Sequence, residues 1–568
     1  MPANLDLNIV SDVLLAVMRY LAPALALLLL LRCGIPLLSF RKEPEVWGWL
    51  LDSNGIRMSL KHWENVIGRH KRCDVVLDYP TVSRNHCVMT RYDDGSWTIT
   101  DIGSKSGVLV NDRPVTIHAL RTADRINIGG VELTFEPISR QQAKVLFGRR
   151  PKATGPAGSL LNLLLLTVFQ TLTCMSYLLR GESSHMTNYL MAFGGLAACQ
   201  WILFMLYLCI RKASFEVETI AFFLCTIGFS AICTVVPAEV MKQLIAVMLG
   251  IVTFLLVGWS LRNLERAKVI RYLAAVGGVA LLAATLIFGK EINGAKNWLI
   301  LQGYSFQPSE LAKICFVYVG ASTMDRLMHR RNIILFIAYT VMLCGFLALM
   351  NDFGTALIFF FAFLLIAYMR SGSMGTLALA CTALGFAGVI GVKLAPHAMR
   401  RFATWRHIWE DPFGAGYQQT RALICIASGG LFGIGIGNGK MKHIFAADSD
   451  MVFATISEEW GLVMGVLCIL AIVILALFAV RCAHVSRSSL YAIASCTAAG
   501  ILLVQTIFNA LGTVDILPLT GVNFPFVSNG GSGMIGMWGL LAFIKAGDTR
   551  RNASFAVNPI RFRRDEDA

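Results

Sequence analysis

The sequence predicts a polytopic α-helical membrane protein that carries one small all-β domain. Three observations support this fold class. The 568-residue chain is 56% hydrophobic and only 15% charged, which is too apolar for the surfaces of several soluble domains. Apolar stretches of about 20 residues, the length that crosses a bilayer as a helix, recur along almost the whole chain. One polar stretch with strand-like alternation interrupts them near the N-terminus.

We expect about 13 membrane spans in total. The first runs from Val13 to Leu31. No basic segment precedes it and no clear small-residue cleavage site follows it, so residues 1–40 are predicted to form a retained anchor and not a cleaved signal. The remaining spans are expected at Leu160–Leu179, Tyr189–Ile210, Thr219–Val236, Leu244–Trp259, Tyr272–Phe288, Leu311–Met324, Ile333–Met350, Thr355–Met369, Met374–Val392, Val452–Val480, Leu490–Leu511 and Ser532–Ile544.

The net charge of +15 indicates membrane topology and not nucleic-acid binding. Lys and Arg gather in the short connections between spans, as the positive-inside rule requires. Asp6 and Asp12 precede the first span, whereas Arg32 and Arg41 follow it, which places the N-terminus outside and the β-domain in the cytoplasm. The same alternation continues to Arg550 and predicts that the tail, residues 549–568, is also cytoplasmic.

This topology leaves four distinctive connections on the outer side of the membrane. They are Gly289–Ser309, Asn351–Gly354, Lys393–Asp450 and Gly512–Gly531. The third is far longer than an ordinary connection, and loops of that length in compact proteins are usually functional. We therefore expect chemistry on this side.

The β-domain is expected over residues 45–138, followed by a basic linker over 139–158. Ser96–Ile102 alternates with period two, and Arg125–Ile128 and Val131–Phe135 flank Gly129-Gly130, a two-residue hairpin signal. Many short strands in such a segment favour a β-sandwich.

Three motifs in this domain resemble the forkhead-associated (FHA) family, which binds phosphothreonine. They are Ile67-Gly68-Arg69, Ser83-Arg84-Asn85-His86 and Gly107–Asn111. The resemblance implies two sets of residues. The residues expected to bind the phosphopeptide are Arg69, Ser83, Arg84 and Ser106. The residues expected to support the loop structure are Gly68, His86 and Asn111.

A guanidinium and hydroxyl donors suit a phosphate dianion. The chain departs from the family where Lys105-Ser106 precedes Gly107, since Thr-Asn is common there. The alternative is an FHA fold that serves only as a protein contact.

In the membrane half, Asn293–Trp298 precedes Phe306–Lys313. Pro308 and Ser309 suit a helix start, and Glu310 and Lys313, three residues apart, share one helix face. Such charges at the mouth of a span are costly to bury. They indicate either a functional site or a paired interfacial anchor.

These residues resemble the signature of the SEDS family (shape, elongation, division and sporulation), the FtsW/RodA group of bacteria. The similarity continues in order to the end of the chain through Asn351–Ala356, Gly414–Gln418, Ser428–Gly433, Asp450–Ala454, Glu458–Gly461, Leu517–Gly521 and Ser528–Ser532. It implies a SEDS-like catalytic core of ten helices. We place that core at residues 272–548, after additional and N-terminal helices at 159–271.

SEDS proteins are peptidoglycan glycosyltransferases, which extend glycan strands from lipid II at the outer face of the bacterial cytoplasmic membrane. The resemblance makes Asp450 the general base, with Glu310 and Lys313 as its partners. Cationic residues are expected to balance the diphosphate of the substrate, and a divalent cation, Mg²⁺ or Mn²⁺, is a further option. The expected substrate-binding residues are Trp298, Asp352, Arg421, Lys440 and Ser528.

The resemblance also implies partners. They are a class B penicillin-binding protein (a transpeptidase), a phosphothreonine-containing protein and the Ser/Thr kinase that modifies it.

Each residue has a simpler interpretation. Asp450 can cap the helix that follows it, and Arg421 and Lys440 can be ordinary loop charges. The glycines from Gly429 to Gly439 favour tight packing over a phosphate cradle. Glu458 and Glu459 either orient the outer loop or are buried neutral carboxyl groups.

Two departures from the SEDS pattern lie close to the expected catalytic residue. The family typically shows Pro-Glu, a variable residue and His-Thr before the catalytic Asp, whereas this chain reads Phe445-Ala446-Ala447-Asp448-Ser449. The usual Tyr before Gly-Gly is Asn529 here. Two alternatives to an enzyme therefore remain, a noncatalytic division or cell-shape scaffold and a transporter of lipid-linked precursors.

Overall fold

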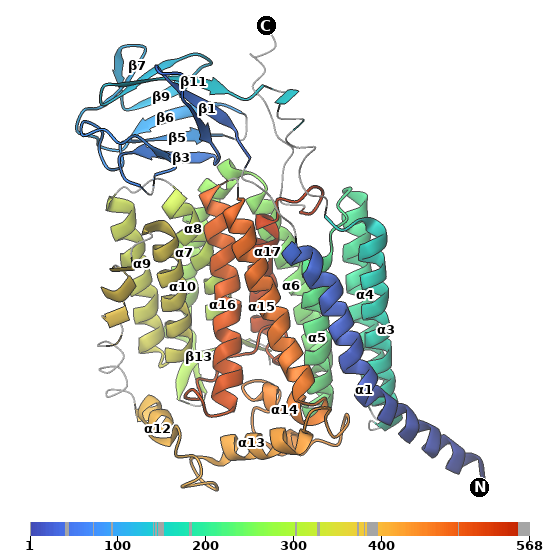
Figure 1. Ribbon diagram of the computed structural model, residues 1–568. Helices are drawn as coiled ribbons and strands as arrows, with labels where there is room; N and C mark the ends of the chain where they lie inside the picture. The colour runs from blue at the N-terminus through green and yellow to red at the C-terminus, as the bar shows by residue number, and fades with distance from the viewer. Residues whose placement is uncertain are drawn as a thin grey trace.

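The computed structural model shows a bundle of long helices with a β-sandwich at one end (Figure 1). It describes residues 2–39, 45–71, 73–92, 95–139, 153–180, 185–292, 294–301, 304–325, 330–371, 396–486 and 488–554, and a few positions within 141–145 and 374–385. Most of the linker, the expected span Met374–Val392 and the tail beyond residue 554 lie outside the described residues.

The β-domain is a sandwich of two sheets, as the alternating pattern predicted. One sheet has the strand order β2-β1-β11-β10-β7-β8, and the other has the order β4-β3-β5-β6-β9. Apolar side chains that alternate along the strands, such as Ile67, Ile99 and Phe135, are fully or almost fully buried between the sheets. The strands are β1 Gly48–Asp52, β2 Arg57–Leu60, β3 Glu64–Gly68, β4 Val75–Val76, β5 Cys87–Arg91, β6 Trp97–Asp101, β7 Val108–Val110, β8 Arg113–Val115, β9 Ile117–Leu120, β10 Arg125–Ile128 and β11 Val131–Pro137.

The predicted Gly-Gly hairpin is confirmed. Strands β10 and β11 pair antiparallel with Ile128 opposite Val131. The two residues between them, Gly129 and Gly130, have φ of 61° and 90°. Positive φ at both central positions is what a tight two-residue turn requires, so the glycines fix the register of this hairpin.

The β-domain contacts the bundle through side chains at the start of β3 and just before it. Glu64, the first residue of β3, accepts hydrogen bonds from Ser488 Oγ at 2.9 Å, Ser489 N at 2.9 Å and Ser489 Oγ at 3.1 Å. These groups form the start of helix α16, whose free backbone N–H groups favour a negative charge. A ring nitrogen of His62 adds a contact to the carbonyl of Ser486 at 3.2 Å.

The long helices match most of the expected spans. Nine helices of the described residues are long and apolar enough to cross a membrane, so the expected count of 13 is not confirmed. The helices are α1 Pro2–Ser39, α3 Pro156–Arg180, α4 Met186–Cys209, α5 Glu216–Val235, α6 Val240–Leu261, α7 Leu264–Phe288, α8 Pro308–Asp325, α9 Arg330–Leu349, α10 Phe353–Ser371, α12 Pro396–Thr404, α13 Tyr417–Gly429, α14 Val452–Glu459, α15 Leu462–His484, α16 Ser489–Thr513 and α17 Gly531–Gly547, with short 3₁₀ turns η2 Pro237–Glu239 and η3 Met441–His443.

One expected span is wrong. Val452–Val480 is not one helix but two, α14 and α15, which are separated at Trp460 and Gly461. Gly461 has φ +89°, and a Cβ there would lie 2.3 Å from the carbonyl oxygen of Leu431. The chain therefore breaks where only glycine fits against the outer loop.

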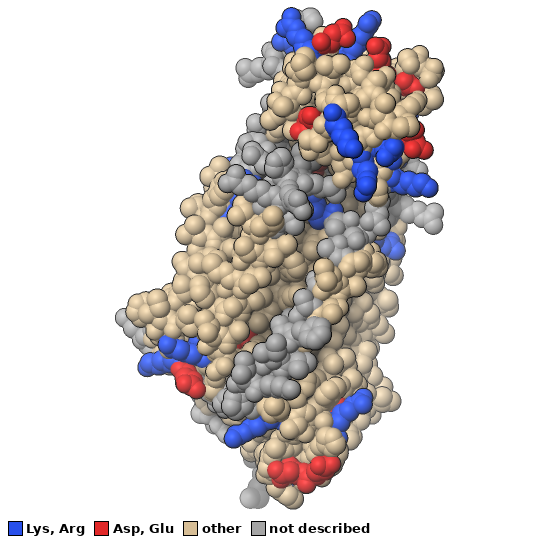
Figure 2. All heavy atoms as spheres, turned by 90° about the vertical axis from the view of Figure 1, so that its left-hand side faces the viewer, with Lys and Arg blue, Asp and Glu red and all other residues tan. Residues whose placement is uncertain are grey.

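The two ends of the bundle differ in the way that the charge pattern predicted. The β-sandwich and the C-terminal end of α17 lie at one end, and β13, α12, α13, α14 and the start of α1 lie at the other (Figure 1). On the face shown in Figure 2, charged side chains gather at these two ends and the band between them is almost free of charge. Such a band is suited to the interior of a bilayer.

Helices α1, α3 and α4 cover α5 from outside, so that α5 is almost entirely buried. Polar contacts inside the bundle hold these helices together, for example Gln170 Nε2 to Gln200 Oε1 at 3.1 Å and Tyr177 Oη to the carbonyl of Ser230 at 2.7 Å. At the end near the β-domain, Lys545 of α17 pairs with Glu218 of α5 at 3.0 Å, and both side chains are fully buried. These contacts fix the added helices to the core.

At the opposite end, the expected connection Gly289–Ser309 forms a small three-stranded sheet. Its strands are β12 Lys290–Ile292, β13 Ala295–Leu301 and β14 Tyr304–Phe306, in the order β12-β13-β14. Helices α12 and α13 and the turn η3 form the long connection before α14. Residues of β13, β14 and α12 line a cavity at this end of the bundle.

Candidate functional site

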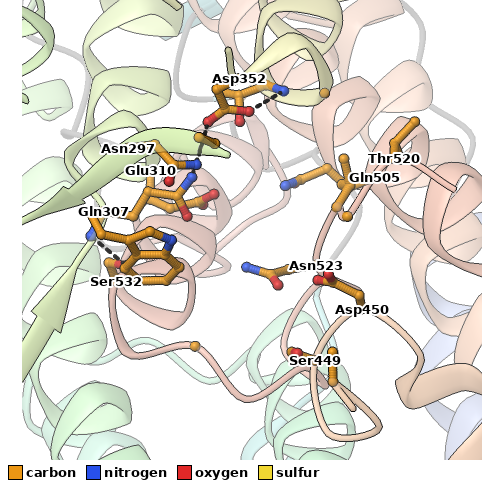
Figure 3. Close-up of a pocket in the computed structure, with 18 of the residues that line it drawn as sticks. Asn297, Gln307, Glu310, Asp352, Ser449, Asp450, Gln505, Thr520, Asn523 and Ser532 are labelled. Carbon is orange, nitrogen blue, oxygen red and sulfur yellow. Dashed lines mark hydrogen bonds between the residues drawn. The ribbon is translucent and has the colours of Figure 1, made fainter. Parts of the chain in front are cut away.

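A cavity of about 1100 Å³ lies at the end of the bundle that is far from the β-domain. Asp450, Glu310, Asp352 and Trp298, four of the residues singled out in the sequence, line it together. Figure 3 shows Glu310, Gln307 and Ser532 on one side of this cavity and Asp450, Ser449 and Thr520 on the other. The motifs that resemblance placed in order along the chain thus meet in space.

Glu310 and Lys313 form a buried ion pair on α8. Lys313 Nζ donates to Glu310 Oε1 at 2.8 Å, and both side chains are almost fully buried. The helix begins at Pro308, as predicted, so the pair lies in its first two turns. Glu310 Oε2 has no hydrogen-bond partner among the described residues. Glu310 is among the residues that line the cavity, whereas Lys313 is not.

Asp352 joins three elements around the cavity. Its Oδ1 accepts from Thr355 N at 3.1 Å and so caps α10. Its Oδ2 accepts from Asn297 Nδ2 at 3.0 Å and Gln307 Nε2 at 3.3 Å (Figure 3). Gln307 N in turn donates to Ser532 Oγ of α17 at 3.1 Å. Asp352 is therefore both a helix cap and the centre of a polar network that lines the cavity.

Asp450 does not cap the helix that follows it. The N-cap of α14 is Met451, which has no side-chain capping hydrogen bond, so the capping interpretation is wrong. Burial raises the pKa of Asp450 to about 6, where Arg401 acts to lower it and Asp448 to raise it. A carboxyl group with this pKa is a stronger base than an ordinary aspartate and is still mostly ionised at neutral pH.

The Asp450 loop, Ile444 to Met451, is held by side chains from two distant segments. Asn509 of α16 donates to the carbonyls of Asp450 at 3.0 Å and Val522 at 2.9 Å. Ser528 is buried, donates to the carbonyl of Ser449 at 2.7 Å and accepts from Phe524 N at 2.8 Å. In this structure Ser528, an expected substrate-binding residue, binds the loop and is not among the residues that line the cavity.

Glu458 and Glu459 orient the glycine-rich loop. Glu458 accepts from the backbone N–H groups of Lys440 at 2.9 Å and Met441 at 2.8 Å. Glu459 accepts from Gly437 N at 3.0 Å and Gly439 N at 3.4 Å. Because these amides already bind carboxylates, they form no phosphate cradle, and the packing interpretation of the glycines holds.

Two expected substrate-binding cations lie away from the cavity. The guanidinium of Arg421 lies 5.6 Å from the ring centre of Phe413 and 5.4 Å from that of Tyr417. Neither Arg421 nor Lys440 is among the residues that line the cavity. In this structure Arg421 lies on α13 and Lys440 directly precedes η3, so the structure does not place either of them at the cavity.

The cavity instead contains two cations that the sequence analysis missed, Arg401 and Lys242. Arg401 Nη1 donates to the carbonyl of Thr520 at 2.9 Å, and its charge acts on Asp450. A strongly amphipathic segment, Pro396–Thr404, was the available signal for Arg401. Gln505 also lines the cavity, and a polar amide inside an apolar span was the signal for it.

The loops at one edge of the β-domain bring the expected phosphate-binding residues together. Arg69 N donates to the carbonyl of Ser83 at 3.0 Å, and Lys105 N donates to Ser83 Oγ at 3.0 Å. Arg69, Arg84 and Ser106 are exposed, and Ser83 is half-buried. Three separate loops thus present a guanidinium and hydroxyls on one surface.

The three residues expected to support the loops of the β-domain lie in close contact with neighbouring segments. His86 is fully buried, contacts the carbonyl of Gly107 through Nε2 at 2.9 Å and accepts from Ser83 N at Nδ1 at 3.2 Å. A Cβ at Gly68 would lie 2.3 Å from the carbonyl oxygen of Arg84. Asn111, with φ 50°, closes the β7–β8 hairpin and accepts from Arg125 N at 3.0 Å.

The described residues contain no group of three or more His, Cys, Asp or Glu side chains placed to hold a metal ion. Five carboxylates line the cavity, Glu239, Glu310, Asp352, Asp448 and Asp450, but no three of them are placed to share one ion. These residues therefore do not fit a divalent cation held by the protein alone.

The sequence matches the FtsW/RodA/SpoVE family of cell cycle proteins over residues 221–552 and the FHA domain over residues 65–129. It is 27% identical over 322 residues to the peptidoglycan glycosyltransferase RodA of Mycobacterium tuberculosis, a match that covers 53% of this chain and 69% of that protein. It is 31% identical over 290 residues to the probable peptidoglycan glycosyltransferase FtsW of Tolumonas auensis, covering 49% of this chain and 74% of that protein.

A solved structure shows the same fold. One chain of a peptidoglycan synthase complex that coordinates polymerization and crosslinking is 25% identical, with a TM-score of 0.51. The similarity covers 58% of this chain and 96% of that chain. The helices outside this similarity and the β-domain are thus additions to a shared core.

Proposed function

Because the chain belongs to the FtsW/RodA/SpoVE family and carries an FHA domain, we propose that it is a peptidoglycan glycosyltransferase. It polymerises lipid II into glycan strands at the outer face of the bacterial cytoplasmic membrane, with its FHA domain and C-terminus in the cytoplasm. The observation that carries this proposal is the partly buried carboxylate of Asp450, which faces a cavity of about 1100 Å³ across from Glu310.

The geometry supports a direct displacement at the sugar. Asp450 takes the proton from the acceptor hydroxyl, and the hydroxyl oxygen forms a bond to the anomeric carbon of the donor sugar. The bond between that carbon and the diphosphate oxygen breaks, and the lipid diphosphate leaves with the electron pair. Arg401 and Lys242 line the same cavity and stabilise the negative charge of the leaving group.

The cavity also suits the two halves of a lipid-linked sugar. Polar side chains such as Asn297, Gln307 and Gln505 face the cavity and can bind sugar hydroxyls. Apolar side chains from α6 and α16, among them Leu249 and Phe508, line the same space and suit an isoprenoid chain. One cavity therefore offers both kinds of surface.

Incubation of the purified protein with labelled lipid II tests the polymerase. Wild type is compared with Asp450→Ala, each with and without a partner transpeptidase of the class B penicillin-binding type. We expect glycan from wild type and none from the variant. Equal glycan from both shows that Asp450 is not the base. If neither protein makes glycan, the assignment as a glycosyltransferase is contradicted. Movement of labelled lipid II across the membrane of vesicles that contain the protein then distinguishes a transporter from a scaffold.

The FHA domain supplies regulation by a phosphothreonine protein, the product of a Ser/Thr kinase. The support is the surface on which Arg69, Ser83 and Ser106 gather from three loops. A guanidinium and hydroxyl donors bind a phosphate dianion through charge-assisted hydrogen bonds. Calorimetry should show binding of phosphothreonine peptides that Arg69→Ala abolishes. Equal heats from phosphorylated and plain peptides would contradict this role and leave the domain as a protein contact.

A further inference from the structure

Asn529 bridges two carboxylates at the cavity. Its side-chain nitrogen donates to Asp448 Oδ2 at 2.7 Å and to Glu239 Oε2 at 3.0 Å, and its backbone N–H donates to the carbonyl of Asp448 at 2.8 Å. All three residues line the cavity that Asp450 lines. An amide group carries two N–H hydrogens, so one side chain serves both carboxylates.

The bridge joins three segments that are far apart in the sequence. Asp448 belongs to the Asp450 loop, Glu239 ends the turn η2 before α6, and Asn529 precedes α17. Lys242 pairs with the other oxygen of Glu239 at 3.1 Å. The loop is thereby fixed to α6 and α17, the two helices that pack most extensively on each other.

We propose that Asn529 is a positioning residue for Asp450: its neutral amide holds Asp448 in place beside the base without cancelling the negative charge of Asp448. This inference rests on the proposed function. A cation at position 529 would fix the loop equally well but would neutralise Asp448, whereas an amide fixes it and leaves the charge.

The charges around Asp450 show why that negative charge matters. Arg401 of α12 favours the ionised form of Asp450, and Asp448 together with burial favours the protonated form. Glu310, Asp352 and Lys242 face the same cavity from α8, α10 and α6. Asp448 thus opposes Arg401, and the balance keeps Asp450 basic enough to take a proton.

The sequence adds an independent observation. Position 448 is where the chain has Asp in place of the family's His, and position 529 is where it has Asn in place of Tyr. The structure places these two exchanged residues in direct contact at 2.7 Å. This contact joins the Asp450 loop to the segment before α17.

The test is the pH dependence of lipid II polymerisation by the full-length protein. Wild type is compared with Asp448→Asn, Asn529→Ala and the double variant. Asp448→Asn has the same size and still offers Asn529 an acceptor, so it removes mainly the charge. In the pH–rate profile of Asp448→Asn, we expect the fall in rate on the acid side (the acid limb) to move to lower pH by about half a unit or more. Asn529→Ala should lower the plateau rate about tenfold through loss of loop geometry.

Gln418→Ala is the matched control, because Gln418 also binds this segment through its side-chain amide, at the carbonyl of Phe445 at 3.3 Å, but bonds to no carboxylate in the part of the chain that the structure describes. Its acid limb should stay in place. If wild type makes no glycan, the proposed function fails and the inference with it. If wild type is active and the acid limb is the same in Asp448→Asn, or the double variant does not show both the shifted acid limb and the lowered plateau rate, the inference is overturned and the proposed function stands.

Discussion

Removal of the Glu64 carboxylate should release the FHA domain from the membrane core. Glu64 makes three hydrogen bonds to the start of α16, at 2.9, 2.9 and 3.1 Å from Ser488 Oγ, Ser489 N and Ser489 Oγ. Loss of a helix-capping side chain costs about 1 kcal/mol, and a charge at a helix N-terminus adds up to about 1 kcal/mol. Glu64→Ala should therefore weaken docking by about 1–2 kcal/mol, a factor of about 5–30.

Hydrogen exchange at the first turn of α16 measures this change directly. The backbone N–H of Ser489 is bonded to Glu64 and should exchange about 5–30 times faster in Glu64→Ala. Glu132→Ala is the matched control, because Glu132 is exposed on β11 of the same domain. Equal exchange in wild type and Glu64→Ala, or equal acceleration in both variants, refutes the reasoning.

Glu64→Ala also tests whether docking of the FHA domain on the membrane core affects catalysis. α16 is a continuous helix from the Glu64 contact to Asn509, which binds the carbonyl of Asp450 at 3.0 Å. At ~1.5 Å per residue this is a distance of about 30 Å. We expect a phosphothreonine peptide to change the polymerisation rate in wild type and to have a smaller effect in Glu64→Ala. An identical response in both would show that α16 does not couple the two sites.

Three further predictions concern the cavity and its loops. With the pKa of Asp450 raised to about 6, the base is ionised above that pH and protonated below it, so the wild-type rate should fall about tenfold from pH 7 to pH 5; a flat profile would contradict the assignment. Arg401 lowers the pKa of Asp450, so Arg401→Ala should move this acid limb to higher pH and raise KM for lipid II about tenfold. Arg400→Ala should change neither quantity, because Arg400 is exposed and does not line the cavity. Gly433→Ala should lower the melting temperature more than Gly437→Ala, because both have positive φ, at +79° and +76°, but only at Gly433 would the Cβ meet a carbonyl oxygen at 2.1 Å; equal losses would mean that the close contact relaxes.

Much of the fold follows from patterns that act locally. The apolar runs predict the long helices, and Gly129-Gly130 predicts the β10–β11 hairpin, because each pattern depends on neighbouring residues alone. The break between α14 and α15 was not predicted for the opposite reason. Trp460 and Gly461 continue an apolar helical pattern, and only the approach of Leu431 from another segment forces the chain to turn there.

The site residues divide in the same way. Glu310 and Lys313 share a helix face, so their spacing was enough to predict the pair. Arg421 and Lys440 were expected beside the substrate because of their charge and their place in the outer connection. The charge of a residue does not tell which way its side chain points. The rings of Phe413 and Tyr417 lie beside the Arg421 guanidinium, whereas Arg401, from the start of the same loop, lines the cavity.

The altered sequence before Asp450 shows most clearly what could not be predicted from the sequence. In the sequence, Asp448 and Asn529 are two separate departures from the pattern of the SEDS family, and they fit either an enzyme with altered acceptor handling or a relative that has lost activity. Although they are 81 positions apart along the chain, they are hydrogen-bonded at 2.7 Å in the structure. A residue that had merely lost its role would have no reason to match a second exchange on another segment. The pairing therefore favours an enzyme with a modified loop over a scaffold, and the pH profile of Asp448→Asn distinguishes the two.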